Sequence, residues 1–182
     1  MKYKNEIVAL SKELGFFHTG FAEANPFYGE IEYYEQWIAS GRNATMKWME
    51  KDIEKRRDVC NILPNAKTVI VVAINYFTDY NYDHTNNDKG KISRYAWGID
   101  YHDIILPKLR LISKRIKEFL PTSTTKEYVD TGYILEKQWA VRAGLGWMGK
   151  NGCVINKNYG SWFFLGTIIT DARSEEHTSE LQ

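Results

Sequence analysis

Residues 68–76 constrain the fold more than any other segment of this chain. They read Thr-Val-Ile-Val-Val-Ala-Ile-Asn-Tyr, a nearly continuous apolar run that is rich in β-branched side chains. A strand with one solvent-exposed face alternates between apolar and polar residues, whereas a strand that is covered on both faces is apolar throughout. The run therefore predicts a central strand in a sheet that has helices on both faces.

Helical and strand patterns alternate along the rest of the chain. Apolar residues at helical spacing predict helices over residues 5–14, 27–40, 104–120 and 134–143. Shorter apolar runs predict strands over residues 16–21, 126–129, 152–156 and 162–170. Pro107 fits its helix only within the first turn, because proline has no backbone N–H. This order predicts an α/β fold with a mixed β-sheet flanked by helices, in which some strand pairs are antiparallel.

The composition excludes several classes of protein. The chain has 182 residues, a formal net charge of +1 and 43% hydrophobic residues. This balance is typical of a folded domain and provides no bulk charge for nucleic acid or an anionic membrane. No apolar run approaches the ~20 residues that a membrane-spanning helix needs. We therefore expect one folded domain over residues 1–172, without a membrane partner.

The chain contains two cysteines, Cys60 and Cys153. Two thiols cannot form a disulfide framework or a four-cysteine metal cluster, so we predict no metal ligands and a cytoplasmic location. Cys153 lies in an apolar stretch and is interpreted as an inert core thiol, and Cys60 has no activating neighbour in the sequence.

Residues 173–182 differ abruptly in composition from the rest of the chain. They have no apolar periodicity, and they resemble the translation of a sequencing-library adapter. We interpret them as a non-native tail and expect the natural protein to continue beyond Ala172. The alternative is an ordinary polar C-terminal tail.

The glycine-rich stretch 144–151 reads Gly-Leu-Gly-Trp-Met-Gly-Lys-Asn and formally matches a dinucleotide fingerprint. A phosphate loop needs a strand before the glycines and a helix after them, and the predicted order here is the reverse. We therefore interpret the glycines as allowing tight turns and the close approach of backbone to a large flat ligand.

Asp130 has two interpretations. It follows the predicted strand 126–129, and a carboxyl group that is partly shielded by aromatic residues can act as an acid. In an α/β fold ligands gather at the carboxyl ends of strands, which suits that role. Aspartate is also a favoured N-cap, and the predicted helix begins at Ile134. Spacing alone favours the cap.

The segment 98–103 precedes the basic helix 104–120 and places His102 between two aspartates. His102 could relay a proton or bind a metal ion, but no second ligand lies at a suitable spacing, so a network of aspartate caps is favoured. The basic face of the helix could contact a nucleic-acid backbone, or it could be an ordinary solvated face.

Five blocks occur in an order that resembles the epoxyqueuosine reductase family. They are Asp-Ile-Glu-Lys-Arg at 52–56, Ser-Arg-Tyr-Ala-Trp-Gly-Ile-Asp-Tyr-His-Asp at 93–103, Val-Asp-Thr-Gly at 129–132 with Leu-Glu at 135–136, Ala-Gly-Leu-Gly-Trp-Met-Gly-Lys-Asn at 143–151, and Tyr-Gly-Ser-Trp at 159–162. The likeness covers nearly all of residues 1–172. It implies the N-terminal part of a cobalamin-dependent iron–sulfur enzyme that reduces epoxyqueuosine to queuosine in the wobble position of tRNA.

The resemblance implies roles for individual residues. Asp130 is similar to the family's proton donor above the corrin ring. The segments that line cobalamin in the family correspond here to Arg56, Ser93, Arg94, Tyr95, Lys150, Asn151, Val154, Ser161 and Leu165. The family often has proline where Tyr133 stands, and some members have cysteine at the position of Ser93.

The resemblance also implies partners: tRNA that carries epoxyqueuosine and an external electron donor, with the protein a monomer. The family's ferredoxin-like segment with two four-iron–four-sulfur clusters is absent from this sequence. We therefore expect no turnover from the 182 residues alone. Two alternatives are a corrinoid-dependent reductase that resembles the reductive dehalogenases, and a non-catalytic module that binds RNA or a corrinoid.

Overall fold

The computed structural model describes residues 2–80 and 90–174. Its main sheet contains four strands: β1 (His18–Glu23), β2 (Thr68–Asn75), β3 (Thr125–Tyr128) and β6 (Phe163–Thr170). Their order in the sheet is β1-β2-β6-β3. Two short strands, β4 (Trp147–Met148) and β5 (Val154–Ile155), form a separate hairpin.

Every pair of neighbouring strands is antiparallel, so the prediction of a mixed sheet was wrong about strand direction. The chain does pass from β2 through a helix to β3, and these two strands run in the same direction. They do not pair with each other, because β6 lies between them and runs antiparallel to both. The prediction anticipated the alternation of strands and helices but not the insertion of the last strand.

β2 is buried on both faces, as its apolar run predicted, and its first six residues are all buried. Val69, Val71 and Ala73 belong to one core cluster, and Ile70 and Val72 belong to the other. This alternation is the two-residue period of a strand, and each face supplies its own hydrophobic core.

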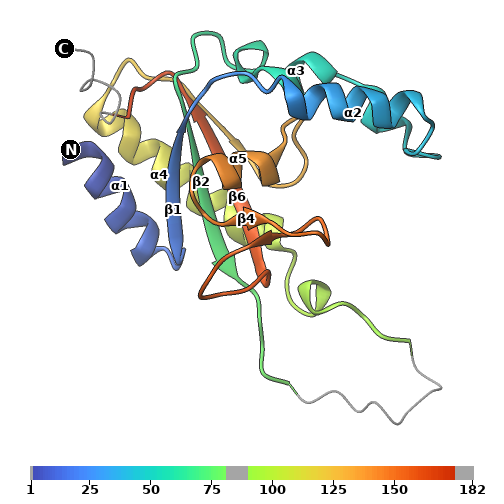
Figure 1. Cartoon of the computed structure of the whole chain (residues 1–182). Coiled ribbons are helices and arrows are strands. Elements are labelled where there is room, and N and C mark those ends of the chain that lie inside the picture. The colour runs from blue at the N-terminus through green and yellow to red at the C-terminus, as the bar shows by residue number, and fades with distance from the viewer. Residues whose placement is uncertain (1, 81–89, 175–182) are drawn as a thin grey trace.

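Helices cover both faces of the sheet (Figure 1). α1 (Lys2–Glu13) and α4 (Tyr101–Phe119) pack on the face of Ile70 and Val72. α5 (Glu136–Arg142) packs on the other face, where Trp139 is fully buried against Phe27. In the part of the chain that the structure describes, no helix combines the length and apolarity needed to cross a membrane.

α4 begins at Tyr101, three residues before the predicted start. The Oδ1 atom of Asp100 accepts a hydrogen bond from the backbone N–H of His102 at 2.9 Å, which confirms the aspartate cap. Pro107 is therefore the seventh residue of the helix, and the prediction that it lies in the first turn was wrong. Packing of one side of α4 into the core outweighs the lost backbone hydrogen bond.

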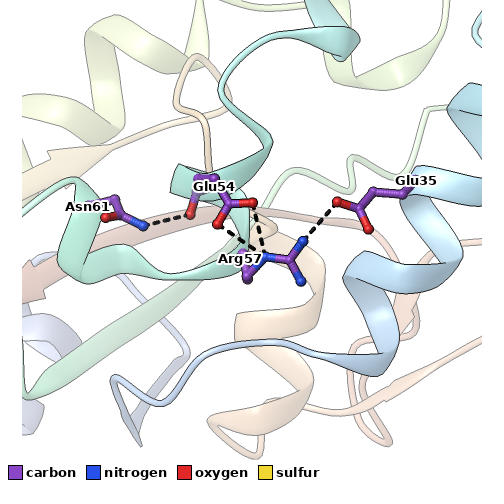
Figure 2. Close-up of polar contacts among 4 residues, drawn as sticks. All are labelled: Glu35, Glu54, Arg57 and Asn61. Carbon is purple, nitrogen blue, oxygen red and sulfur yellow. Dashed lines mark hydrogen bonds and ion pairs between the residues drawn. The ribbon is translucent and has the colours of Figure 1, made fainter.

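Ion pairs and hydrogen bonds connect the elements between β1 and β2 (Figure 2). These elements are α2 (Gly29–Ala39), α3 (Ile53–Arg57) and two short 3₁₀ helices, Lys47–Glu50 and Val59–Asn61. Arg57 donates to Glu35 of α2 at 2.8 Å and to Glu54 at 3.2 Å. The side chain of Asn61 donates to the carbonyl oxygen of Glu54 at 3.0 Å. The contacts join α3 to its neighbours on both sides.

The glycine-rich stretch forms the hairpin and no phosphate loop. β4 follows the glycines where a phosphate loop would need a helix, and it pairs with β5. A Cβ atom at Gly146 would lie 2.1 Å from the carbonyl oxygen of Ile155, so the hairpin requires glycine there.

The predicted tail falls mostly outside the described residues, which end at Ser174, and so do residues 81–89. The backbone N–H of Ser174 donates to the hydroxyl of Thr68 at 3.0 Å. The division into residues 1–172 and 173–182 stays a prediction.

Gly20 provides a test of the packing between β1 and α5. A Cβ atom there would lie 2.1 Å from the carbonyl oxygen of Ala143, so Gly20→Ala should lower the free energy of unfolding by about 1–3 kcal/mol. The control is Gly29→Ala, because nothing lies within 4 Å of a Cβ atom at Gly29. Chemical denaturation of both variants measures the difference, and equal stabilities would contradict the packing described here.

Candidate active site

Asp130 lies in an irregular loop, residues 129–135, that leaves the sheet after β3. Its side chain is exposed, and its backbone has a left-handed φ of 57°. A non-glycine residue adopts this conformation at a cost of about 1–2 kcal/mol. α5 begins at Glu136, and its N-cap, Leu135, makes no side-chain cap bond. The interpretation of Asp130 as an N-cap was therefore wrong, because the helix begins too far along the chain.

Two hydrogen bonds hold Asp130 between two helices. The hydroxyl of Tyr101, the first residue of α4, donates to Oδ2 of Asp130 at 2.7 Å. The backbone N–H of Asp130 donates to Oε1 of Glu136, the first residue of α5, at 2.8 Å. The Tyr101 ring stacks on Phe164 of β6 with its centroid 4.2 Å away and an interplanar angle of 11°. The position of Asp130 is therefore set by α4, α5 and β6 together.

The pKa values of this cluster are shifted by burial and by neighbouring charge. Burial is the largest cause that raises the pKa of Glu136 to about 7. The negative charge of Asp130 raises it further, while the backbone N–H of Asp130 and the nearby side chains of His102 and Lys137 oppose the shift. Burial and the hydrogen bond to Asp130 raise the pKa of Tyr101 far above its usual value. Tyr101 is therefore a neutral donor at any physiological pH.

His102 extends the cluster away from Asp130. Its ring stacks on Tyr101 with centroids 4.2 Å apart, and its Nδ1 atom lies 2.7 Å from Oδ1 of Asp100. Its backbone N–H and its ring both lower the pKa of Asp100. The buried Nε2 atom has no hydrogen-bond partner among the described residues. In residues 2–80 and 90–174 no group of three or more His, Cys, Asp or Glu residues could hold a metal ion.

A cavity of about 570 Å³ opens beside Tyr101, and we call it the aromatic cavity. It lies between the end of β2, residues 78–80 and the segment from Arg94 to Ile105. Its apolar lining includes Ile74, Tyr76, Trp97, Tyr101, Ile104 and Phe164. Asp130 does not line it, but the hydroxyl of Tyr101 connects the two.

Three of the predicted cofactor residues, Ser93, Arg94 and Tyr95, occupy one wall of this cavity or adjoin it. Tyr95 is exposed and lines the cavity, and Ser93 precedes the 3₁₀ helix Arg94–Ala96. The guanidinium of Arg94 donates to the carbonyl oxygens of Thr78 and Tyr80. It also lies over aromatic rings, 4.9 Å from Phe77, 5.3 Å from Trp97 and 5.5 Å from Trp162. Arg94 therefore joins the two segments that form the wall.

A second group of predicted cofactor residues includes two apolar side chains on the opposite face of the sheet. Val154 is buried in the cluster that surrounds Trp139, and Leu165 packs against that cluster. Lys150 and Asn151 are exposed in the turn between β4 and β5, and the side-chain oxygen of Asn151 accepts from the N–H of Cys153 at 3.1 Å. Ser161 is partly buried just before β6. Val154 and Leu165 thus lie on the opposite side of the sheet from Tyr101 and Phe164, which line the aromatic cavity.

Arg56 lies apart from both groups, in α3. Its side chain is 6% exposed, and its guanidinium carbon is 5.6 Å from the Tyr34 ring centroid and 5.4 Å from that of Tyr133. Its Nε atom is buried without a hydrogen-bond partner in the described part of the chain. Because Tyr133 belongs to the loop 129–135, Arg56 contacts the segment that carries Asp130.

Tyr101 and Glu136 received no role from the sequence, although both contact Asp130. Tyr101 is 29 residues away from Asp130, and no local pattern indicates that the two meet. Glu136 occupies the first turn of a helix, where an acidic residue is ordinarily explained by the helix dipole. Cys60 is partly buried, and burial raises the pKa of its thiol, which agrees with an unreactive cysteine.

Comparison with known proteins decides the family. Residues 56–131 match the family model described as epoxyqueuosine reductase QueG, DUF1730. The epoxyqueuosine reductase of Synechocystis sp. is 48% identical over 139 residues, which cover 75% of this chain and 46% of that protein. The epoxyqueuosine reductase of Atelocyanobacterium thalassa is 42% identical over 169 residues, which cover 91% of this chain and 53% of that protein. The chain belongs to the epoxyqueuosine reductase family. It spans about half the length of the curated relatives it matches.

Solved structures of the family have the same fold. The epoxyqueuosine reductase of Streptococcus thermophilus matches with a TM-score of 0.83 and 34% identity, over 100% of this chain and 49% of that one. An epoxyqueuosine reductase bound to an epoxyqueuosine-modified tRNA-Tyr stem loop matches with a TM-score of 0.81 and 31% identity. The match covers 93% of this chain and 45% of that one. The Bacillus subtilis enzyme matches with a TM-score of 0.82 and 26% identity, over 98% of this chain and 50% of that one. In that structure the catalytic aspartate loop is swung out of the active site.

Glu136 predicts a specific dependence of stability on pH. Its pKa rises from 4.5 to about 7 on folding, so between these values the folded chain holds the proton more tightly than the unfolded chain. The raised pKa of Glu136 therefore adds up to about 3 kcal/mol to the free energy of unfolding. This contribution is complete below pH 4.5 and is lost as the pH rises through 7. Glu136→Gln should remove this dependence.

Urea denaturation of the wild type and the variant at intervals from pH 4 to pH 8 measures the difference. Glu118→Gln is the control, because Glu118 is exposed at the far end of α4. The same pH profile in the wild type and in Glu136→Gln would show that Glu136 does not titrate in this range.

Proposed function

We propose that this chain forms the cofactor-binding and proton-donating part of an epoxyqueuosine reductase, which reduces the epoxide of epoxyqueuosine to queuosine in the tRNA wobble position. Family membership supports the reaction, and the relative bound to an epoxyqueuosine-modified stem loop supports the substrate. The observation that carries the proposal for this chain is the geometry of Asp130. Its exposed carboxylate is held by two helices beside an aromatic cavity.

Asp130 is the proposed proton donor. Tyr101 donates to Oδ2 of Asp130, and Oδ1 has no hydrogen-bond partner in the part of the chain described. The second oxygen is therefore available to hold the proton and face the substrate. Removal of the epoxide oxygen breaks two carbon–oxygen bonds, consumes two electrons from the cofactor and two protons, and releases water. We propose that Asp130 gives the first proton to the oxygen as the first of these bonds breaks, and that it recovers a proton from solvent. The Tyr101 hydroxyl then stabilises the carboxylate that remains, because a hydrogen bond to an ionised acceptor is stronger than a neutral one.

The surroundings of Asp130 fit the cobalamin that the family resemblance implies. A corrin ring is broad and edged with amides, so it requires aromatic walls and closely approaching backbone more than charge. The aromatic cavity provides Tyr76, Tyr95 and Trp97, and the glycine-rich hairpin exposes Trp147. When bound, the cofactor supplies electrons through its cobalt. The residues proposed to hold it are those that the resemblance assigned: Arg56, Ser93, Arg94, Tyr95, Lys150, Asn151, Val154, Ser161 and Leu165.

The remaining partners belong to the complete protein. Cys60 and Cys153 cannot supply the ligands of two four-iron–four-sulfur clusters, so we place the clusters and the contact with an external electron donor outside this chain. Arg110, Lys114 and Lys117 are exposed on α4, and we propose that they contact the tRNA backbone. Arg115 is less suited to that role because it pairs with Glu6 and Glu118. We propose that the complete protein is a cytoplasmic monomer.

Asp130→Asn tests the proton donor. Asparagine has nearly the same shape but cannot donate the acidic proton, so we expect the full-length protein to lose at least about 100-fold in conversion rate. The rate is measured with cobalamin, a reductant and tRNA that contains epoxyqueuosine, by mass spectrometry of the tRNA nucleosides. Undiminished conversion by Asp130→Asn would overturn the proposed role.

Asp171→Asn is the matched control. Asp171 follows the C-terminal end of β6, at the opposite end from Leu165, and accepts hydrogen bonds from Thr124. The same substitution at this site should leave the conversion rate within about twofold of the wild type, because surface changes away from a site have small effects.

A further inference from the structure

Asp130 itself makes few packing contacts, although buried Val129 and Ile134 anchor the two ends of its loop. The Asp130 side chain is exposed, and residues 129–135 contain no helix or strand. Within the loop, the N–H of Thr131 donates to the carbonyl oxygen of Val129, and Gly132 lies against the ring of Tyr128. Because little apolar surface holds Asp130 itself, its placement depends on the hydrogen bonds that it makes with residues outside the loop.

Those hydrogen bonds act on different parts of Asp130. Tyr101 contacts the side chain, and Glu136 contacts the backbone N–H. The contact with Glu136 acts on the left-handed backbone that determines where the side chain points, together with the hydrogen bond from the N–H of Thr131 to the carbonyl oxygen of Val129, which spans Asp130. Tyr101 cannot replace it, because the side chain can rotate about its own bonds.

Glu136 is suited to this task by its place in α5. The helix is anchored by Trp139 and Ala140, both 0% exposed. The carboxylate of Glu136 therefore extends back over the loop from a rigid support. The described groups whose charges act on it are Asp130 in the loop, His102 in α4 and Lys137 in α5.

We propose that Glu136 is a positioning residue that keeps Asp130 directed towards the substrate by binding the Asp130 backbone N–H. This inference rests on the proposed role of Asp130 as proton donor. In this role Glu136 acts through Asp130 and transfers no proton itself. In the Bacillus subtilis relative the catalytic loop is swung out of the active site, whereas in this chain the loop is held by Tyr101 and Glu136.

Three substitutions in the full-length protein separate the hydrogen bond from the charge. Glu136→Gln keeps an acceptor oxygen at the same reach without the charge. Glu136→Asp keeps the charge, but the shorter side chain withdraws the oxygen from the N–H of Asp130. Glu136→Ala removes both. Glu127→Ala in β3 is the control, because this side chain accepts from Thr125 and lies outside the loop.

The first readout is hydrogen exchange of the Asp130 amide, followed by NMR. We expect Glu136→Gln to exchange within about threefold of the wild type, and Glu136→Asp and Glu136→Ala to exchange at least about tenfold faster. The second readout is epoxyqueuosine conversion. The same two variants should lose about tenfold or more in kcat with little change in KM for tRNA, whereas Glu136→Gln and Glu127→Ala should stay near the wild type.

The outcomes distinguish the two proposals. If Asp130→Asn stays active, the proton donor is wrong whatever the exchange rates show. If Asp130→Asn is inactive but Glu136→Asp keeps both its activity and its slow exchange, Glu136 does not position Asp130. Should Glu136→Ala fail to fold, the comparison of Glu136→Gln with Glu136→Asp still decides, because each retains a polar side chain at the helix start.

Discussion

The insertion of β6 between β2 and β3 is the constraint on which the rest of this structure depends. β2 is apolar on both faces and needs a paired strand on each side as well as helices above and below. β1 supplies one partner, and β6 supplies the other from the far end of the described chain. By pairing with β3 as well, β6 fixes the end of β3, and with it the Asp130 loop, beside α4 and α5.

The same strand also organises the site. Phe164 of β6 supports the ring of Tyr101, and the hydroxyl of Tyr101 then contacts Asp130. Gly166, two residues further along, lies so close to α4 that a Cβ atom would be 3.0 Å from Ile105 and Leu109. This close approach packs α4 directly against the sheet. It therefore fixes the position of Tyr101, which lies in the first turn of α4. The packing of α4 against the sheet and the hydrogen bond from Tyr101 to Asp130 thus both depend on β6.

The site was predictable where a residue's chemistry was indicated by its own neighbours in the chain. The blocks around Asp130, Arg94 and the glycine-rich hairpin are local, and they sufficed to indicate the family. Whether Asp130 caps a helix or stands free was not predictable from spacing, because both roles place an aspartate shortly before an apolar helical run. The deciding fact is that α5 begins at Glu136, six residues later.

The sequence by itself determined the two-sided burial of β2, the amphipathic character of α4 and the turns of the hairpin, because each follows from the local periodicity of side chains or from glycine. Only the tertiary structure decided the antiparallel order of the sheet and the contacts of Tyr101 and Glu136 with Asp130. Strand order depends on which distant segment best fills the space beside β2, and hydrogen bonds between α4 and the loop join residues 29 positions apart. The strand order and these long-range contacts depend on the packing of the whole chain, so they cannot be predicted from a local sequence pattern.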